Sequence, residues 1–505
     1  MTDRALHLDP RLGGNTSSAR DGQTDGMPVE GVPVHLQHDP SLLFMPQPEM
    51  AVPQAEFTWS DILSAFQTMV ADVIPWLMWA VLFLFVIRYA VLLVSGFLDA
   101  LRYKPLLKIH PHSPPVSLIV PLTGRTASLR AWLTAALELD YPEYEILLVN
   151  DGLADDELMS VKEDYGFERF PEAYRDRLHT KQVSGIHISV RDSRLRWLEK
   201  CRGGRADAIN AALNCARFPL VCVLDVHLVF KVDFLSQMAE RYARTPDAKA
   251  VMTPICVTEG VDAGFLAHWQ QADIGRTLVF GGINKAGLGL RLAGTPVVGL
   301  FDKELLVAAG GFRNDVLNPE NHWAVDLQNG LSGKQSTRLA YAPEPLVFSP
   351  ACKTLGDLGR KHADRQQALM ENLNLNRRMA GQSRHGNRLT YLFMLVLEGF
   401  WPAIELLGYG AVIVLWLVGL LSTQTTALLL AIGFGMSILP VLAGLLLESH
   451  LFYPHVRVQV VSKQFMAAVM EGLGLRLLSV FWFLRGLLRH EAKWGRISKI
   501  LAVSK

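Results

Sequence analysis

Long uncharged apolar runs lie near both ends of the chain. Residues 73–87 carry no charge, and the apolar run continues over 89–98 after Arg88. Because roughly 20 consecutive apolar residues cross a bilayer as a helix, we expect one transmembrane helix here. A second run, residues 406–447, is also uncharged, and its polar break at 422–426 predicts two spans joined by a short external turn.

Basic residues beside these runs give the expected orientation. Arg102, Lys104 and Lys108 follow the first run, so the positive-inside rule places the downstream segment in the cytoplasm. Residues 464–489 are apolar but interrupted by Glu471 and other charges, which favours an amphipathic helix on the inner leaflet over a fourth span. We therefore expect three spans and a multi-pass protein of the cell inner membrane.

The pattern changes in the middle of the chain to short β-rich runs that alternate with helical stretches. Strands that alternate with crossover helices predict an α/β domain with a mostly parallel sheet, which binds ligands beyond the carboxyl ends of its strands. Asp151 and Asp225 directly follow two of these expected strands. The expected strands are 116–121, 144–149, 187–190 and 220–224, and the expected helices are 127–139 and 206–216.

These patterns give a domain organisation for the whole chain. The parts are a disordered N-terminal tail (1–56), a transmembrane helix with its flanks (57–103), the cytosolic α/β domain (104–350), interfacial helices (351–401), a transmembrane hairpin (402–448), and an amphipathic helix with a basic tail (449–505).

Composition excludes some classes of protein. The formal net charge is +1, whereas a nucleic-acid binder needs a clear excess of Lys and Arg to neutralise phosphates. The five cysteines form no C-x-x-C pair, which indicates free thiols in a reducing compartment. We therefore expect no nucleic-acid partner and no disulfide framework.

Several runs occur together in an order that carries a resemblance. Those in the central segment are SLIVPLTGR, YPEYEILLVNDG, RGGRADAINAAL and VCVLDVHLVFKVDFL. They resemble the membrane-bound family-two glycosyltransferases, which include synthases of cellulose-like and poly-N-acetylglucosamine-like polymers. Three later runs, TPVVGLFDKELLVAAGGF, EGFWPAIELLGYG and FWFLRGLLRHEAKWGRISK, resemble the family's acceptor-side stretch, its entry to the C-terminal membrane helices and its tail.

The resemblance implies a GT-A fold and inverting transfer of a sugar from a nucleotide sugar, UDP-linked in this interpretation. The acceptor would be a lipid-linked or polysaccharide chain at the membrane, in envelope or exopolysaccharide synthesis.

On the donor side, the resemblance gives roles to four residues. Asp151 matches the aspartate that binds the uracil-like base, although N-D-G is also a good turn sequence. Arg202 and Arg205, beside Asn210, match basic positions near the diphosphate, and their fork geometry suits phosphate oxygens. A solvated basic turn is the alternative for the two arginines.

The metal motif D-x-D of the family reads Asp225-Val226-His227 here. It would hold a divalent metal, Mn or Mg, on the donor diphosphate. Imidazole suits Mn²⁺ better than Mg²⁺, so His227 is either a metal ligand or a packing residue.

The catalytic base and the last motif are altered as well. Inverting transfer to a hydroxyl needs a carboxylate to accept the proton. After Gly310-Gly311-Phe312, Glu320 has about the right spacing and Asp326 the better residue context, while a surface carboxylate is the alternative for each. The family motif Q-x-x-R-W keeps only Arg365, so the stacking Trp is missing.

These altered motifs leave a second function open. The chain is either an active glycosyltransferase or a catalytically silent paralogue that acts as a structural or regulatory subunit among other polysaccharide-synthesis subunits.

Overall fold

The computed structural model describes residues 58–102, 113–124, 128–171, 174–258, 264–277, 297–328, 338–375, 377, 391–392, 395–452, 458–470 and 478–489. The chain divides into two units, residues 1–65 and 66–505, and the second holds the domain and the site. The expected disordered tail at 1–56 and the end of the basic tail lie outside the described residues.

The second unit contains an eleven-stranded sheet with the order β3-β4-β5-β2-β1-β6-β9-β8-β11-β7, and β10 pairs with β8 beside this path. The strands are β1 (Val116–Leu122), β2 (Tyr144–Asn150), β3 (Phe167–Arg169), β4 (Val183–Ser189), β5 (Leu195–Lys200), β6 (Leu220–Val223), β7 (Val229–Phe230), β8 (Ala248–Val257), β9 (Val297–Asp302), β10 (Arg338–Tyr341) and β11 (Val347–Ser349).

The sheet is mixed, so the expectation of a mostly parallel sheet is wrong outside its centre. Strands β5, β2, β1 and β6 are parallel neighbours, as the alternating pattern predicts. Strand β4 is antiparallel to β5 because a short hairpin joins them, and β9 runs antiparallel to both β6 and β8. The carboxyl ends of β2 and β6 nevertheless meet at one edge of the sheet, where Asp151 and Asp225 follow.

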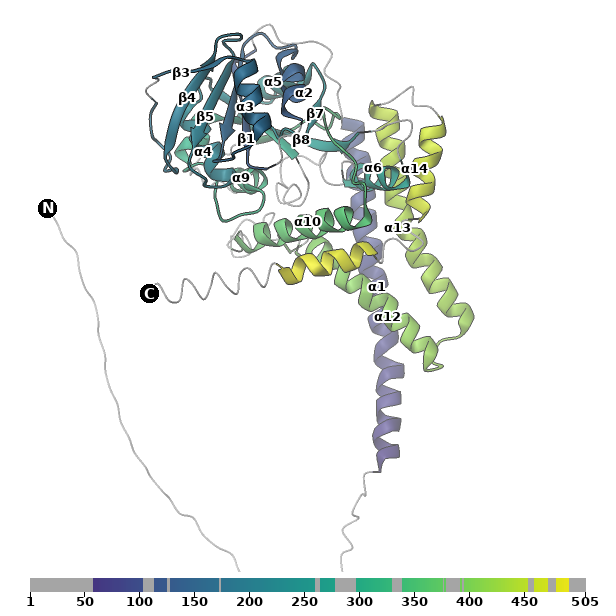
Figure 1. The fold of residues 1–505 in the computed structure, drawn as a ribbon. Helices are drawn as coiled ribbons and strands as arrows, with labels where there is room; N and C mark the ends of the chain where they lie inside the picture. Colours follow the sequence, from purple (N-terminus) through teal and green to yellow (C-terminus); the bar gives the residue numbers. More distant parts are fainter. Residues whose placement is uncertain are drawn as a thin grey trace, which may run out of the picture. The chain divides into compact units, whose positions relative to one another are not determined.

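Helices cover both faces of the central strands (Figure 1). In β1, Leu118 and Val120 join one apolar core and Ile119 joins the other, because successive side chains of a strand point to opposite faces. The first core includes α2 (Leu129–Leu137), α3 (Asp156–Asp164) and α5 (Phe234–Arg244). The second includes α4 (Arg205–Cys215), α8 (Lys303–Ala308) and α9 (Pro319–Gln328).

The remaining described helices are mostly apolar or lie next to apolar ones. They are α1 (Trp59–Arg102), α6 (Phe265–Thr277), α10 (Leu355–Leu375), the π-helix Leu395–Gly399, α12 (Trp401–Leu417), α13 (Thr423–Phe452), α14 (Val458–Met470) and a helix over residues 478–489. Helix α6 packs on α13 and α14 through Ala272, which contacts Val441 and Ala468.

Among the described helices, Thr423–Gly444 in α13 is the one whose length and composition suffice to cross a membrane. Met78–Ala90 in α1 and Ala403–Leu417 in α12 are shorter apolar stretches. Helices α12 and α13 are separated by residues 418–422, close to the expected hairpin turn. These three stretches coincide with the three expected spans, and the three-span topology stays a prediction.

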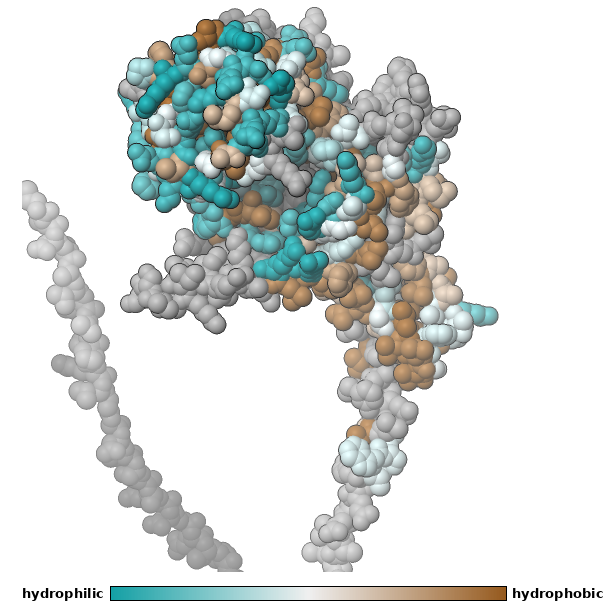
Figure 2. Space-filling model, viewed as in Figure 1, coloured by the Kyte–Doolittle hydropathy of each residue, from teal (hydrophilic) through white to brown (hydrophobic). Residues whose placement is uncertain are grey.

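Large apolar side chains are exposed along α12 and α13 (Figure 2). A water-soluble surface rarely carries so many of them together, so this surface suits lipid. They include Leu407, Ile413, Val414 and Leu417 in α12 and Leu428, Ile432, Leu439 and Leu446 in α13.

Arg88 lies within the apolar part of α1. It is buried, and its guanidinium lies 4.7 Å from the ring centroid of Trp401 on α12. A cation over an aromatic face is attracted by the ring quadrupole, so Arg88 links α1 to α12.

Candidate functional site

Arg205 joins two of the predicted carboxylates. Its Nη1 donates to Oδ1 of Asp225, and its Nη2 donates to Oε1 of Glu320 at 2.6 Å. Arg205 begins α4, Asp225 follows β6, and Glu320 lies in the first turn of α9. Burial lowers the pKa of Arg205, but the carboxylates of Glu320 and Asp225 outweigh it and raise the pKa above its ordinary value.

Asp151 lies buried beneath the turn that leads into α4. Its Oδ1 accepts hydrogen bonds from Nζ of Lys200 at 2.6 Å and from the backbone N–H of Gly203 at 2.8 Å. Its Oδ2 accepts from the backbone N–H of Gly204 at 2.8 Å. Asp151 therefore shapes the Gly-Gly turn between the two arginines, and its expected contact with the base stays a prediction.

Sequence reasoning missed Lys200, whose side chain is fully buried. Its Nζ lies 2.6 Å from Asp151 and 2.5 Å from Oδ2 of Asp207, so one cation neutralises two carboxylates. Strand β5 reads LRWLEK, so no apolar pattern marked Lys200 as a buried residue. A charge is rarely buried unless it is paired, and here the two carboxylates supply the pairing.

Arg202 is the predicted cation that stays open to solvent. It is exposed, and it makes no hydrogen bond or ion pair with another residue in the described part of the chain. The backbone of Arg202 lies against Gly152, where an added Cβ would lie 3.2 Å from its nitrogen. Gly152 also has a φ of +73°, so this close approach requires glycine. The N-D-G and R-G-G-R turns therefore touch each other.

Asn210 holds a distant turn. Its Nδ2 donates to the carbonyl oxygen of Phe312 at 2.8 Å, and its Oδ1 accepts from the N–H of Phe312 at 2.8 Å. Gly311 has a φ of +76°, and a Cβ there would lie 2.5 Å from Oδ1 of Asn210. Asn210 is a positioning residue for the G-G-F turn, and its expected contact with the nucleotide sugar stays a prediction.

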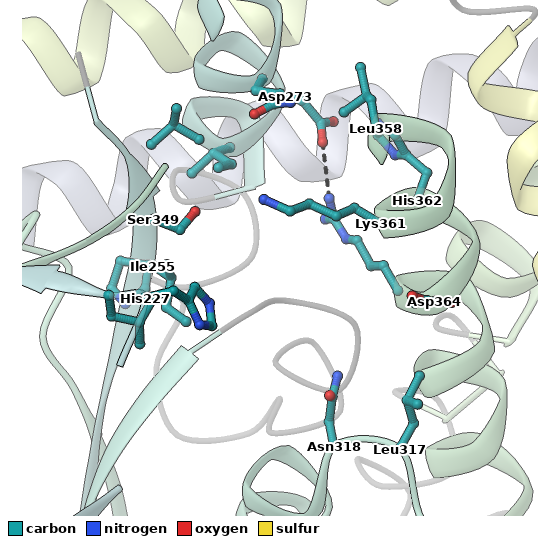
Figure 3. Close-up of a pocket in the computed structure, with 16 residues that line it drawn as sticks. His227, Ile255, Asp273, Leu317, Asn318, Ser349, Leu358, Lys361, His362 and Asp364 are labelled. Carbon is teal, nitrogen blue, oxygen red and sulfur yellow. Dashed lines mark hydrogen bonds and ion pairs between the residues drawn. The ribbon is translucent and has the colours of Figure 1, made fainter. Parts of the chain in front are cut away.

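A pocket of about 360 Å³ opens beside Asp225, and sixteen described residues line it (Figure 3). His227 belongs to one wall, and Lys361 on α10 to the facing wall. Arg365, also on α10, lines the same pocket. Nη1 of Arg365 donates to Oδ2 of Asp273 on α6 at 3.1 Å. No motif pointed to Asp273 or to Lys361, which lines the same pocket one helical turn before Arg365.

His227 lines the pocket and also interacts electrostatically with Asp225 and Arg205. Desolvation by its surroundings lowers the pKa of His227 below its ordinary value. The carboxylate of Asp225 opposes this change, while the charges of Lys361 and Arg205 add to it. His227 is therefore neutral at physiological pH, which is the form of imidazole that binds a metal.

The described residues contain no group of three or more His, Cys, Asp or Glu side chains that could hold a metal ion. Asp225 and His227 provide two ligands, and Asp225 already accepts a hydrogen bond from Arg205. This set does not fit a metal held by side chains alone. It fits a divalent cation that takes most of its ligands from a bound diphosphate and from water.

The two candidate bases both belong to α9. Glu320 is buried at 8% exposure and ion-paired to Arg205. Asp326 lies on the same helix, but its side chain is outside the described part of the chain, so the choice between the two stays a prediction.

Comparison with curated protein sequences finds no match. The mannosyltransferase PcManGT from Pyrobaculum calidifontis, solved in complex with GDP-Man and Mn²⁺, is 15% identical, with a TM-score of 0.47 over 82% of this chain and 98% of that one. S. aureus TarS 1–349 in complex with UDP-GlcNAc is 11% identical, with a TM-score of 0.35 over 72% of this chain and 91% of that one.

The family model of glycosyl transferase family 2 matches residues 117–281, from β1 to beyond α6. This range contains the two glycine-linked arginines and the Asp225-Val226-His227 motif. Residues 117–281 are thus similar to a glycosyl transferase family 2 domain, and this match supports a glycosyltransferase enzyme.

Proposed function

We propose that the protein is a membrane-bound inverting glycosyltransferase that moves a sugar from a UDP-linked nucleotide sugar to a lipid-linked or polysaccharide acceptor, in envelope or exopolysaccharide synthesis. The observation that carries this proposal is the Arg205 bridge between Asp225 and Glu320, which are close in the chain to His227 and Asn318 of the pocket that Arg365 also lines. It brings together residues from four distant segments that sequence reasoning had selected.

On the donor side, Arg202 and Arg205 bind the diphosphate. Arg202 is exposed and available for this contact, and the turn between the two arginines is held from below by Asp151. A divalent metal at Asp225 and His227 supplies further positive charge to the leaving diphosphate when it is bound. Hydrogen-bond donors and cations that already point at the developing charge lower the barrier most, because these groups do not have to reorganise during the reaction.

On the acceptor side, Glu320 is the base for a hydroxyl acceptor. In the structure, Oε1 of Glu320 accepts a hydrogen bond from Arg205 and is therefore occupied. Binding of the donor diphosphate gives Arg205 a new anionic partner. Glu320 is then released to accept the proton of the acceptor hydroxyl.

The membrane location extends the same proposal. The domain lies in the cytoplasm, where soluble nucleotide sugars occur, and the apolar helices lie in the cell inner membrane as a multi-pass assembly. The apolar helix Thr423–Gly444 and the exposed apolar surface of α12 support this placement. An acceptor held at the bilayer reaches the pocket with little loss of translational freedom.

A silent paralogue that serves as a structural or regulatory subunit is the second candidate. The observation in its favour is that Asp225 and Glu320 are both held by the same arginine. A silent protein would bind a nucleotide sugar without releasing nucleoside diphosphate.

The test is the melting temperature of the detergent-solubilised chain with UDP-sugars, with and without Mn²⁺. A ligand that binds only the folded state stabilises it by RT ln(1 + [L]/Kd), so saturating donor raises the melting temperature, and Mn²⁺ increases the shift. The Asp225→Ala variant loses the Mn²⁺ effect, whereas Arg191→Ala, an exposed arginine at the opposite edge of the sheet, behaves as the parent chain. If no UDP-sugar shifts melting under any metal condition, the proposed function is wrong.

A further inference from the structure

The pocket beside His227 has a mainly aliphatic wall. Its apolar members are aliphatic side chains from β8, from α6, from α10 and from the turns that precede β7 and α9. No Phe, Tyr or Trp occurs among the described residues that line it. Sugar rings are commonly bound on aromatic faces, whereas aliphatic side chains suit a hydrocarbon chain. The members used in this argument are Leu228, Ile255, Val257, Ile274, Leu317 and Leu358.

The facing wall carries positive charge. Lys361 and Arg365 are four residues apart on α10, so they lie on the same side of that helix. Arg365 is paired with Asp273, whereas Lys361 makes no hydrogen bond or ion pair with any residue in the described part of the chain. The Lys361 side chain extends from α10 into the pocket toward the wall that carries Ser349 and His227 (Figure 3).

The pocket also lies next to the candidate membrane span. Asp273 and Ile274 on α6 line it, while their neighbour Ala272 packs against Val441 of α13 and Ala468 of α14. One helix therefore separates the pocket from the apolar helix Thr423–Gly444. An acceptor with a hydrocarbon chain would have only this short distance to travel from the bilayer.

The altered base motif suits an acceptor that carries a phosphate group. A phosphate monoester has its second pKa near 6, so at neutral pH its oxygens are already ionised. Such a nucleophile needs no carboxylate to remove a proton. The ion pair that holds Glu320 would then be no obstacle to transfer.

We infer that the acceptor is a lipid monophosphate, with its phosphate on Lys361 and Arg365 and its chain along the aliphatic wall. This inference rests on the proposed function. A phosphate oxygen of the lipid attacks the anomeric carbon and forms a new carbon–oxygen bond. The bond from that carbon to the donor diphosphate breaks, and the nucleoside diphosphate leaves with the electron pair. The product is a sugar joined to the lipid through one phosphate.

Binding to the full detergent-solubilised chain, measured by calorimetry, tests the inference with four probes. They are geranylgeranyl monophosphate, geranylgeraniol, inorganic phosphate and cellohexaose. We expect geranylgeranyl monophosphate to bind at least roughly tenfold more tightly than the alcohol or free phosphate, because only it engages both walls. Preferential binding of cellohexaose would instead indicate a polysaccharide acceptor and would overturn the inference.

Three variants locate the site. Lys361→Ala weakens binding of the lipid phosphate roughly tenfold and leaves geranylgeraniol unchanged. Leu317→Gln weakens both lipids, and its partly exposed position makes misfolding a small risk. Lys353→Ala removes an exposed lysine outside the pocket and changes neither. An equal effect of Lys361→Ala and Lys353→Ala would contradict the proposed site.

The two proposals fail in different ways. If UDP-sugars shift melting but geranylgeranyl monophosphate does not bind, the lipid-phosphate acceptor is wrong and the proposed function stands. If the lipid phosphate binds but no UDP-sugar shifts melting, the proposed function is wrong, and the acceptor role of the pocket is lost with it.

Discussion

Asn210 and Phe312, which are 102 positions apart, are joined by two hydrogen bonds of 2.8 Å between one side-chain amide and one peptide group. Asn210 lies in α4, the helix that Arg205 begins, and Phe312 ends the turn that precedes α9 and Glu320. The helix that carries Arg205 is therefore also fixed to the turn that leads toward α9.

Replacement of Asn210 should loosen this connection. Asn210→Ala leaves a buried N–H and a buried carbonyl of Phe312 without partners, which costs about 2 to 4 kcal/mol of stability. Asn210→Asp keeps the acceptor but sets a buried carboxylate against the carbonyl oxygen of Phe312, so it should not restore the stability. Thermal melting of the full chain should place both variants below the parent. Equal melting of all three would show that the two hydrogen bonds do not hold the turn.

We expect Arg205 to act through the geometry of its guanidinium group as well as through its charge. Arg205→Lys keeps one positive charge but cannot donate to Asp225 and Glu320 at once, because an ammonium lacks the planar fork. We expect Arg205→Ala to lower kcat/KM for nucleoside diphosphate release roughly 100-fold and Arg205→Lys to recover only part of it. Full activity of the lysine variant would rule out the bridging role.

We expect Lys200 to contribute to the stability of the folded protein. Lys200→Met removes the cation from two buried carboxylates, Asp151 and Asp207, and leaving a buried charge without its partner costs about 3 to 5 kcal/mol. Lys353→Met, at an exposed position, should change stability by less than about 0.5 kcal/mol. The melting temperatures of both variants, measured in one detergent, give the comparison. A parent-like melting temperature for Lys200→Met would contradict the prediction.

Asp192 should make part of the stability depend on pH. Its hydrogen bonds from Arg194 lower the pKa of Asp192 below its ordinary value of 3.8, against the opposing effect of burial. A lowered pKa in the folded state means that the stabilisation is complete above pH 3.8 and is lost as the pH falls through the lower, folded-state value. Asp192→Asn keeps a side-chain oxygen for the turn but no charge. The difference in melting temperature between parent and variant should therefore shrink as the pH falls below 3.8; a constant difference would contradict the ion-pair explanation.

The three-span topology predicts opposite locations for two reporters. A reporter inserted in the turn at residues 418–422 should be external, because α12 and α13 enter and leave the membrane on either side of it. A reporter fused after Lys505 should be cytoplasmic, with the basic residues that precede it. An external signal from the second fusion would require another span between 453 and 505.

The sequence by itself determined the features that depend on neighbouring residues. The short β-rich runs at 116–121 and 144–149 predicted β1 and β2, and the helix expected over 206–216 is α4 within one residue at each end. Uncharged runs located the apolar helices. The ordered motifs selected Arg205, Asp225 and Glu320, although nothing in the chain showed that one arginine would hold both carboxylates.

Tertiary structure decided the contacts that join distant segments. Two examples are the antiparallel direction of β9 and the burial of Lys200 beside two carboxylates. Both depend on which strands are neighbours in the sheet, and local periodicity does not encode this. The aliphatic pocket is formed by side chains from the sheet, α6 and α10, and these segments are separated by tens of residues in the chain. Apolar residues that recur every 2 positions in a strand, or about every 3.6 positions in a helix, show which face of that element is apolar. Only packing determines which other element meets that face.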